Sequence, residues 1–274
     1  MPTDETTELV RVAVEAGRAA AAVHRRHLGQ VRVADWSEKG VSDFVTHVDR
    51  EAEERIVELV RRRYPGHAFL AEEAAAAAVT AAAPGAAPPE WLWIVDPLDG
   101  TTNYLHGYPM YAASVAVLHT GELVAGAVVA AATGEEWTAA RGGGAFKNGE
   151  RIRCSNIEHL RLALIGTGFP FKALERLPEY LRQFDVVLRH TAGIRRAGSA
   201  ALDLCHLATG YFDGFWELVL SPWDVAAGTL IAREAGAIVT RPDGDPAVVT
   251  GVGAVLGGNP AIYGALAELL AGSW

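Results

Sequence analysis

Cysteine is scarce in this sequence, with only Cys154 and Cys205 among 274 residues. Two cysteines are too few for the disulfide framework of a small secreted protein, and alone they do not make a zinc site. Both lie away from the acidic segments of the chain, so neither belongs to a cysteine-based nucleophile motif. We therefore expect two reduced, buried thiols.

Basic residues are in the minority. Lys and Arg together number 24 against 33 Asp and Glu, which gives a formal net charge of -9. A general binder of nucleic acid needs clustered Lys and Arg to neutralise the phosphates, so we expect no nucleic-acid partner. A small phosphate ester stays possible as a substrate, provided that metal ions reverse the local charge.

Long uncharged apolar runs are also missing. No such run reaches the roughly 18–20 residues that span a bilayer. The most apolar stretch, residues 111–133, is broken by His119 and Glu122 and is typical of two buried strands. The N-terminus, MPTDETTELV, lacks the basic region and apolar core of a signal peptide. We therefore expect a cytoplasmic protein with no membrane partner.

Hydrophobic periodicity predicts helices that alternate with mostly short strands, which indicates a layered α/β or α+β architecture. Thr46 followed by Asp49 has the form of a capping box at a helix start. We expect one domain over residues 1–274, with an N-terminal lobe to about 190 and a C-terminal lobe from about 191. The Ala- and Pro-rich residues 74–90 predict a surface loop. The predicted helices are 6–28, 46–64, 172–188, 199–209, 223–235 and 260–271, and the predicted strands are 67–70, 91–95, 111–118, 123–131, 135–140, 145–153, 162–166, 193–197, 211–216, 237–240 and 253–257.

The segment Asp96-Pro-Leu-Asp-Gly-Thr-Thr102 follows a compact apolar strand. It carries two carboxylates three residues apart, and hard cations such as Mg²⁺ prefer oxygen ligands of this kind. Gly100 allows a backbone N–H to approach a ligand closely. An Asx-type turn that merely ends the strand is the alternative interpretation.

Other acidic residues also stand at the ends of buried apolar segments. Glu72-Glu73 follows one predicted strand and Glu217 ends another, while Asp224 stands at the start of a predicted helix. Each has a plain alternative: a solvated strand end for the glutamates, and a helix N-cap for Asp224. Taken together, these acids favour a shared site.

Two segments resemble the signatures of the inositol monophosphatase family. Residues 93–103, WIVDPLDGTTN, are similar to the first, and residues 223–228, WDVAAG, running on to Glu234-Ala-Gly236, are similar to the second. Further matches cover most of the chain and are similar to bacterial inositol-1-monophosphatases in particular: Lys39, residues 43–49, Glu72-Glu73, residues 142–149, 167–172, 196–203, 212–217 and 258–260.

The resemblance implies a layered α/β/α/β/α fold of the inositol monophosphatase and fructose-1,6-bisphosphatase kind, usually dimeric, dependent on Mg²⁺ and inhibited by Li⁺. It implies a first metal held by Glu72, Asp96 and the carbonyl of Leu98. It implies a second metal held by Asp96, Asp99 and Asp224, with Asp96 bridging. A third, weaker ion is often found near Glu72.

The same resemblance implies that Thr101, supported by Asp49, orients the attacking water together with Glu72. The amides of Gly100 and Thr101 would receive the phosphate. Glu73 would support the site from behind, and Lys39 would be a nearby positive charge. The implied substrate-binding residues are Asp99, Gly100, Thr101, Ala200, Glu217 and Asp224.

Two features depart from the family pattern. Ala71 stands where a glycine usually precedes the Glu-Glu pair, and the following loop is almost pure Ala and Pro. Both departures adjoin Glu72, beside the implied position of the third ion. The sequence also lacks a Gly-rich phosphate loop ending in Lys-Ser/Thr. We therefore favour direct, metal-aided attack by water over a covalent phosphoenzyme.

The implied reaction is hydrolysis of small phosphate monoesters, with myo-inositol-1-phosphate the favoured substrate. Histidinol-phosphate phosphatase, fructose-1,6-bisphosphatase and 3′-phosphoadenosine nucleotidase are alternatives of the same fold. Some of these carry Lys or Arg after Asp-Gly-Thr, whereas this chain has Thr102 and Asn103, which favours the inositol branch. An added regulatory role, binding the transcription machinery, is the alternative from another class, although no basic tail supports it.

Overall fold

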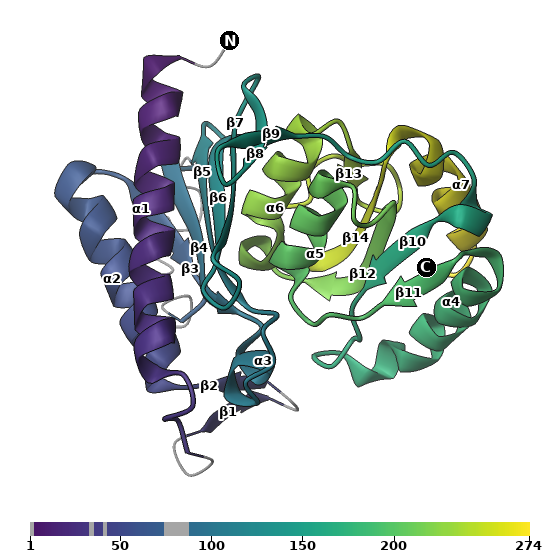
Figure 1. Cartoon of the computed structure of the whole chain (residues 1–274), viewed down its shortest axis with the longest axis horizontal. Coiled ribbons are helices and arrows are strands. Elements are labelled where there is room, and N and C mark those ends of the chain that lie inside the picture. The colour runs from purple at the N-terminus through teal and green to yellow at the C-terminus, as the bar shows by residue number, and fades with distance from the viewer. Residues whose placement is uncertain (1–2, 33–35, 41–42, 74–87) are drawn as a thin grey trace.

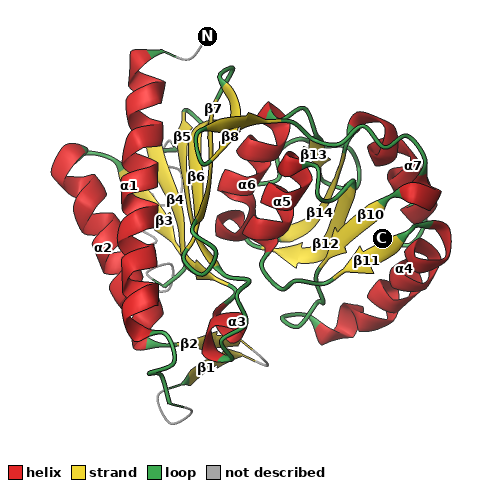
Figure 2. Ribbon diagram, in the orientation of Figure 1, coloured by secondary structure: helices red, strands yellow, loops and turns green. Residues whose placement is uncertain are grey.

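The computed structural model describes residues 3–32, 36–40, 43–73 and 88–274. These residues form two large β-sheets and three layers of helices, in the order helix, sheet, helix, sheet, helix (Figures 1 and 2). Of the predicted surface loop 74–90, residues 74–87 lie outside the described residues.

The first helical layer consists of α1 (Asp4–His27) and α2 (His47–Arg63). Thr3 caps α1 by accepting a hydrogen bond from the Thr6 amide. The buried face of α1 contains four alanines and Gly17, and these small residues let the helix lie close to the sheet. Thr46 and Asp49 form the predicted capping box at the start of α2. Both helices therefore begin where side-chain oxygens satisfy their first free amides.

The second layer is a seven-stranded sheet in the order β3-β4-β5-β6-β7-β8-β9. β3 and β4 are parallel, so their carboxyl ends lie at the same edge, and the other neighbours are antiparallel. β4 is buried on both faces: Trp93 and Val95 pack with α1 and α2, and Ile94 packs on the other face. The strands are β3 (Ala68–Ala71), β4 (Trp91–Asp99), β5 (Ala112–His119), β6 (Glu122–Ala130), β7 (Glu135–Ala140), β8 (Gly144–Lys147) and β9 (Glu150–Ile152).

The middle helices α5 (Ala200–Thr209) and α6 (Pro222–Glu234) separate this sheet from a five-stranded one. The second sheet has the order β11-β10-β12-β14-β13. The helices α4 (Leu177–His190) and α7 (Pro260–Leu270) cover its outer face. Its strands are β10 (Leu164–Thr167), β11 (Gly193–Arg195), β12 (Gly214–Leu220), β13 (Ile238–Thr240) and β14 (Gly253–Gly258).

The structure differs from the sequence expectations in a few places. The chain passes from the first sheet to the second between residues 152 and 164, because β10 pairs with β12. A hairpin of β1 (Ser37–Gly40) and β2 (Asp43–Val45) and the short helix α3 (Thr101–Leu105) were not predicted. Short 3₁₀ turns at Leu160–Leu162 and Leu174–Arg176 complete the described elements.

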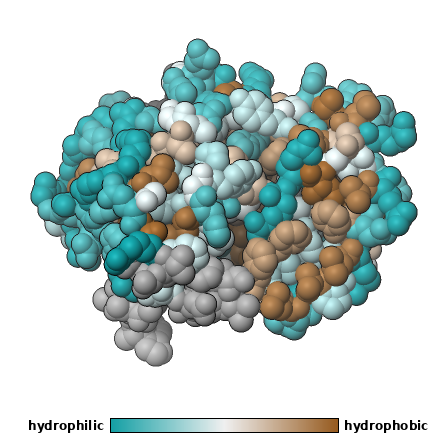
Figure 3. Space-filling model, turned by 60° about the horizontal axis from the view of Figure 1, so that its bottom comes forward, coloured by the Kyte–Doolittle hydropathy of each residue, from teal (hydrophilic) through white to brown (hydrophobic). Residues whose placement is uncertain are grey.

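Hydrophobic residues gather on the right of the face shown in Figure 3. On α4 and just before it, large exposed apolar side chains recur every seven residues, at Leu174, Leu181 and Leu188. A seven-residue spacing brings side chains to the same face of a helix.

Among the described residues, no helix combines the length and the apolarity needed to cross a bilayer.

Candidate active site

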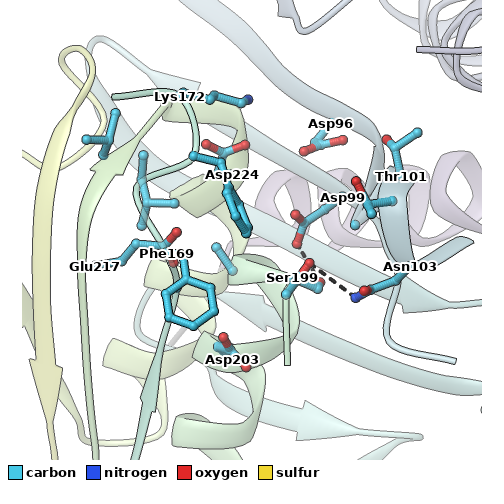
Figure 4. Close-up of a pocket in the computed structure, with 18 of the residues that line it drawn as sticks. Asp96, Asp99, Thr101, Asn103, Phe169, Lys172, Ser199, Asp203, Glu217 and Asp224 are labelled. Carbon is cyan, nitrogen blue, oxygen red and sulfur yellow. Dashed lines mark hydrogen bonds between the residues drawn. The ribbon is translucent and has the colours of Figure 1, made fainter. Parts of the chain in front are cut away.

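Three carboxylates meet between the two sheets. Asp96 and Asp99 come from the end of β4, Asp224 comes from the first turn of α6, and one oxygen of each lies within 4.8 Å of the others. Figure 4 shows the three side chains turned toward one another. They line a cavity of about 350 Å³, and every residue proposed for substrate binding lines the same cavity: Asp99, Gly100, Thr101, Ala200, Glu217 and Asp224.

Burial raises the free energy of the ionised form of these three carboxylates. Burial and the nearby charges of Glu72, Asp99 and Asp224 raise the pKa of Asp96 well above its usual value. Burial raises the pKa of Asp99 to about 6, against the hydrogen bonds from Ser199 and Ala201. Burial also raises the pKa of Asp224 to about 7, with Lys172 acting in the opposite direction. A divalent cation would relieve this repulsion, so the donor set fits a hard metal ion.

The turn after β4 fixes the first two carboxylates. Asp96 Oδ1 accepts a hydrogen bond from the Leu98 amide at 2.9 Å. Gly100 has a φ of 90°, and a Cβ there would lie 2.7 Å from the Met110 carbonyl oxygen. Only glycine combines this left-handed conformation with this close contact. The Asp-Gly step therefore lets the chain leave the sheet and start α3 directly beside the carboxylates.

Asp99 is held from the opposite side of the cavity. Its Oδ2 accepts hydrogen bonds from Ser199 Oγ at 2.5 Å and from the Ala201 amide at 2.8 Å. Ser199 is also the N-cap of α5. Ser199 is the first residue of the predicted helix 199–209, where a serine is a recognisable capping signal, but this pattern alone predicts no contact with Asp99. These two bonds occupy Oδ2 and leave Oδ1 for a ligand.

Asp224 has a structural partner as well. Its Oδ2 accepts a hydrogen bond from the Ser221 amide at 2.6 Å. Ser221, and not Asp224, is the N-cap of α6, and Asp224 completes the capping box at the third helical position. The alternative interpretation of Asp224 as the helix N-cap is therefore wrong. The capping box aims the carboxylate at the other two acids.

A hydrogen bond joins Thr101, at the start of α3, to Asp49 of α2. The Thr101 hydroxyl donates to Asp49 Oδ1 at 2.9 Å and also lies 3.0 Å from the Leu98 carbonyl oxygen. Asp49 Oδ2 accepts from the amide and hydroxyl of Thr46, so this acid caps α2 at the same time. Burial raises the pKa of Asp49. The hydroxyl that donates to Asp49 keeps lone pairs that can accept a hydrogen bond from a water.

Three predicted site residues remain: Glu72, Glu73 and Lys39. Glu72 follows β3 and lines the cavity. Glu73 is tied to α2, because its amide donates to Glu53 Oε2 at 2.8 Å. Lys39 belongs to β1, and its side chain lies outside the described residues.

The other wall of the cavity comes from the second sheet and its loops. Glu217, from β12, lines this wall, and burial raises the pKa of its carboxyl well above the usual value. Lys172 and Phe169 also line it and are labelled in Figure 4. Both residues belong to the segment 167–172, which resembles the family without an implied role for either side chain.

Asn103 ties the two walls together. Its amide nitrogen lies 2.6 Å from the Met110 carbonyl oxygen and 2.9 Å from that of Ala197. The first partner lies before β5, and the second lies before α5. Asn103 therefore fixes α3 against the segment that carries Ser199, a role that no local pattern reveals.

Clustered buried carboxylates at a sheet edge, beside a positioned hydroxyl, define a candidate metal-dependent hydrolase of the layered α/β class. Comparison with known proteins narrows this class. The model of the inositol monophosphatase family matches residues 5–274, and the chain belongs to that family.

Two relatives show how similar the sequences are. An inositol-1-monophosphatase of Mesorhizobium japonicum is 41% identical over 94% of this chain and 92% of its own length. The Nus factor SuhB of Pseudomonas aeruginosa is 42% identical over 94% of each chain.

Solved structures of similar proteins have the same fold. The extragenic suppressor protein suhB from Bartonella henselae has a TM-score of 0.87 at 37% identity, covering 97% of this chain and 99% of its own. The inositol monophosphatase from Anabaena has a TM-score of 0.82 at 34% identity, covering 96% of this chain and 95% of its own. The predicted fold and family are thus confirmed, and the protein is a phosphoric monoester hydrolase of a generally metal-dependent family.

Proposed function

We propose that this protein hydrolyses small phosphate monoesters, with myo-inositol-1-phosphate the favoured substrate, by direct attack of water. The observation that carries the proposal is the cluster of Asp96, Asp99 and Asp224 in one buried cavity. A dianionic ester could not enter so acidic a cavity without cations, because like charges in a region of low dielectric repel strongly.

Mg²⁺ is the proposed metal. Glu72, Asp96 and the Leu98 carbonyl would hold one ion, and Asp96, Asp99 and Asp224 a second, while a third, weaker ion near Glu72 is also possible. When bound, such ions neutralise the phosphate, activate water and stabilise the leaving alkoxide. Inhibition by Li⁺ is expected from the membership of the inositol monophosphatase family.

The chain's own groups would position the reactants. Thr101, oriented by Asp49, would accept a hydrogen bond from the attacking water, with Glu72 as a second partner. The amides of Gly100 and Thr101 would donate to phosphate oxygens. Glu217 and the Ala200 backbone would face the alcohol together with Asp99 and Asp224, which the position of Ala200 and Glu217 on the opposite wall supports.

The test is a phosphate-release assay on purified protein stripped of metal. Activity should be absent in excess chelator and return with Mg²⁺. The panel should hold inositol-1-phosphate, histidinol phosphate, fructose-1,6-bisphosphate and 3′-phosphoadenosine-5′-phosphate, with the first expected to give the highest kcat/KM. Full activity in chelator would contradict the metal-dependent mechanism. A higher kcat/KM with another ester of the panel would show that inositol-1-phosphate is not the favoured substrate.

A second candidate function is a regulatory one. Relatives that carry the name Nus factor favour the role at the transcription machinery that the sequence analysis leaves open. A pull-down from a lysate, compared between wild type and a catalytically dead variant, tests it. Recovery of transcription factors by both forms would support a role separate from catalysis, and recovery of none by either would exclude it.

Assembly and location complete the proposal. We expect a cytoplasmic homodimer with no nucleic-acid partner. Leu181 and Leu188 on α4 and Leu174 just before it are exposed, and such side chains suit a contact between two copies. Sedimentation of wild type and of Leu181→Glu tests this: a monomer in both would contradict a dimer.

A further inference from the structure

The wall of the cavity that faces the alcohol contains two polar side chains without an assigned role, Arg196 and Asp203. Arg196 lies on the segment before α5, and Asp203 lies in its first turn. In Figure 4, Asp203 lies beneath Phe169, on the far side of Ser199 from Asp96 and Thr101. This end of the cavity is therefore separate from the three clustered carboxylates.

Each of these two side chains has a buried polar atom without a partner. Among the described residues, neither Arg196 Nε nor Asp203 Oδ1 has a hydrogen bond, although both atoms are buried and Asp203 is only 1% exposed. Buried polar atoms are nearly always paired, so two such exceptions in one cavity wall need an explanation. Among the same residues, no hydrogen bond or ion pair joins Arg196 to Asp203 directly.

The guanidinium of Arg196 is held by aromatic rings in place of a carboxylate. Its central carbon lies 4.9 Å from the ring centroid of Phe169 and 4.9 Å from that of Phe171. The two rings lie nearly perpendicular, at 74°. Cation–π contacts of this kind cover the faces of a guanidinium and leave its N–H groups to bind at the edge. Arg196 is thus positioned by the two rings and, within the described part of the chain, makes no ion pair with a carboxylate.

The chemistry of the two groups selects their ligand. A guanidinium can only donate hydrogen bonds, and the carbonyl oxygen of a carboxyl group accepts them, whereas a hydroxyl does both. A second phosphate on the substrate would pair with Arg196 but would bring a further charge beside the buried carboxyl groups of Asp203 and Glu217. An alkyl or aryl alcohol would leave both polar groups without partners. A hydroxyl, directly or through one water, satisfies both.

We propose that Arg196 and Asp203 form a specificity subsite that binds hydroxyl groups of the alcohol remote from the phosphate, and so selects polyol phosphates over alkyl, aryl and doubly phosphorylated ones. The subsite deepens the proposed phosphatase function and rests on it. Phe169 and Phe171, which are 37% and 39% exposed, place Arg196 at the mouth of the cavity.

The test compares two substrates that differ only in hydroxyl groups, myo-inositol-1-phosphate and cyclohexyl phosphate, at saturating Mg²⁺. The measured quantity is the ratio of their kcat/KM values. We expect wild type to prefer the inositol ester by about tenfold or more, since a site built to bind hydroxyls discriminates against an analogue that lacks them. Arg196→Gln and Asp203→Asn should each lower this ratio at least about tenfold.

A matched control is Arg195→Gln. Arg195 is exposed and bonds only to the Ile194 carbonyl among the described residues, so its loss should leave the ratio unchanged. Fructose-1,6-bisphosphate serves as the doubly phosphorylated probe. If Arg196→Gln reduces its turnover more than that of inositol phosphate, the subsite binds an anion and the hydroxyl assignment is wrong.

The remaining outcomes separate the subsite from the function itself. No hydrolysis of either ester by wild type with Mg²⁺ overturns the proposed function. Hydrolysis of both esters without preference by wild type overturns the subsite alone, and this measurement requires no variant to fold. Equal losses on both esters in the two variants, together with a lower Tm, would show a structural role and also overturn the subsite.

Discussion

Asp99 divides its two oxygens between the fold and the cavity. Oδ2 accepts from Ser199 and Ala201, so the carboxylate cannot rotate freely. Asp96 and Asp224 likewise each give one oxygen to a backbone amide, of Leu98 and Ser221. Each acid is therefore oriented before any metal arrives, and the other oxygen remains for a ligand. Such orientation lowers the entropy lost on binding.

Asp99→Asn tests this division. The amide oxygen of asparagine can keep the bonds from Ser199 and Ala201, which turns the NH₂ group toward the proposed metal. We expect kcat to fall by well over tenfold, a change of more than about 1.4 kcal/mol in the barrier, and Mg²⁺ affinity to fall with it. Calorimetric Mg²⁺ titration and phosphate release measure the two effects. In chelator the variant should melt no lower than wild type, since a buried charge has been removed.

Thr101→Ala separates the positioning of water from the holding of metal. It removes the hydroxyl that binds Asp49 but keeps the backbone amide and every proposed metal ligand. Mg²⁺ affinity and KM should change little, while kcat should fall by roughly 10²–10⁴-fold. Thr102→Ala is the control, because Thr102 is exposed and should cost far less. Equal effects at both positions would mean that the hydroxyl of Thr101 has another task.

At the scale of elements, the corner between β4 and α3 depends on Gly100. An alanine there combines a left-handed backbone with a Cβ only 2.7 Å from the Met110 carbonyl oxygen. We expect Gly100→Ala to lower the free energy of unfolding by about 2–4 kcal/mol and to lower kcat, because Asp99 and Thr101 flank the corner. Gly107→Ala is matched in conformation, with a φ of 69° and nothing within 4 Å, and should cost only about 1 kcal/mol. Urea denaturation compares them, and equal costs would show that the close contact is harmless.

Regular elements were predictable where their pattern is long or their turn chemistry is specific. The helices α1, α2 and α6 and the strands β4 to β7 agree with the prediction to within a few residues. The turn Asn148-Gly149 joins β8 and β9 with φ angles of 50° and 81° and so divides the single predicted strand 145–153 in two, although Asn-Gly is a pair typical of tight hairpin turns. The β1–β2 hairpin and α3 were missed because each is too short for a period to show.

The supports of the site were harder to predict than its acids. Asp96, Asp99 and Asp224 stand in recognisable segments, and the structure brings them together. His24 gives no such signal: it lies in α1, and its Nε2 is 2.9 Å from the Pro97 carbonyl oxygen. Burial lowers its pKa to about 4, so it is neutral and donates this bond. Its contact depends on how α1 packs against β4, which local sequence does not encode.

At the scale of the whole molecule, the two sheets and the middle helices converge on one acidic cavity. β4 and α3 supply one side of the cavity, and α5, α6, β12 and the segment 168–172 supply the rest. Acids from such distant elements repel one another when no cation is present. The fold therefore stores electrostatic strain at the site, and this strain couples overall stability to metal and to pH.

The sign of this coupling follows from the two pKa values. Burial raises the pKa of Asp99 to about 6 and that of Asp224 to about 7, from 3.8. Between pH 4 and these values the metal-free folded protein holds more protons than the unfolded chain, so its free energy of unfolding falls as pH rises through this window. A bound cation displaces those protons, so its binding weakens in acid and strengthens toward neutral pH.

The difference in Tm between Mg²⁺-loaded and chelator-treated protein should therefore grow from pH 5 to pH 8. Groups remote from the site affect both samples equally and cancel in this difference. Mg²⁺ at about 100 times its Kd contributes about 2.7 kcal/mol, which corresponds to roughly 5 °C or more at pH 8, and the gain should be close to zero at pH 5. Asp99→Asn should flatten the dependence, because one of the titrating ligands is gone. A Tm difference that stays constant from pH 5 to pH 8 in wild type would mean that Mg²⁺ stabilises the protein somewhere other than at these three carboxylates.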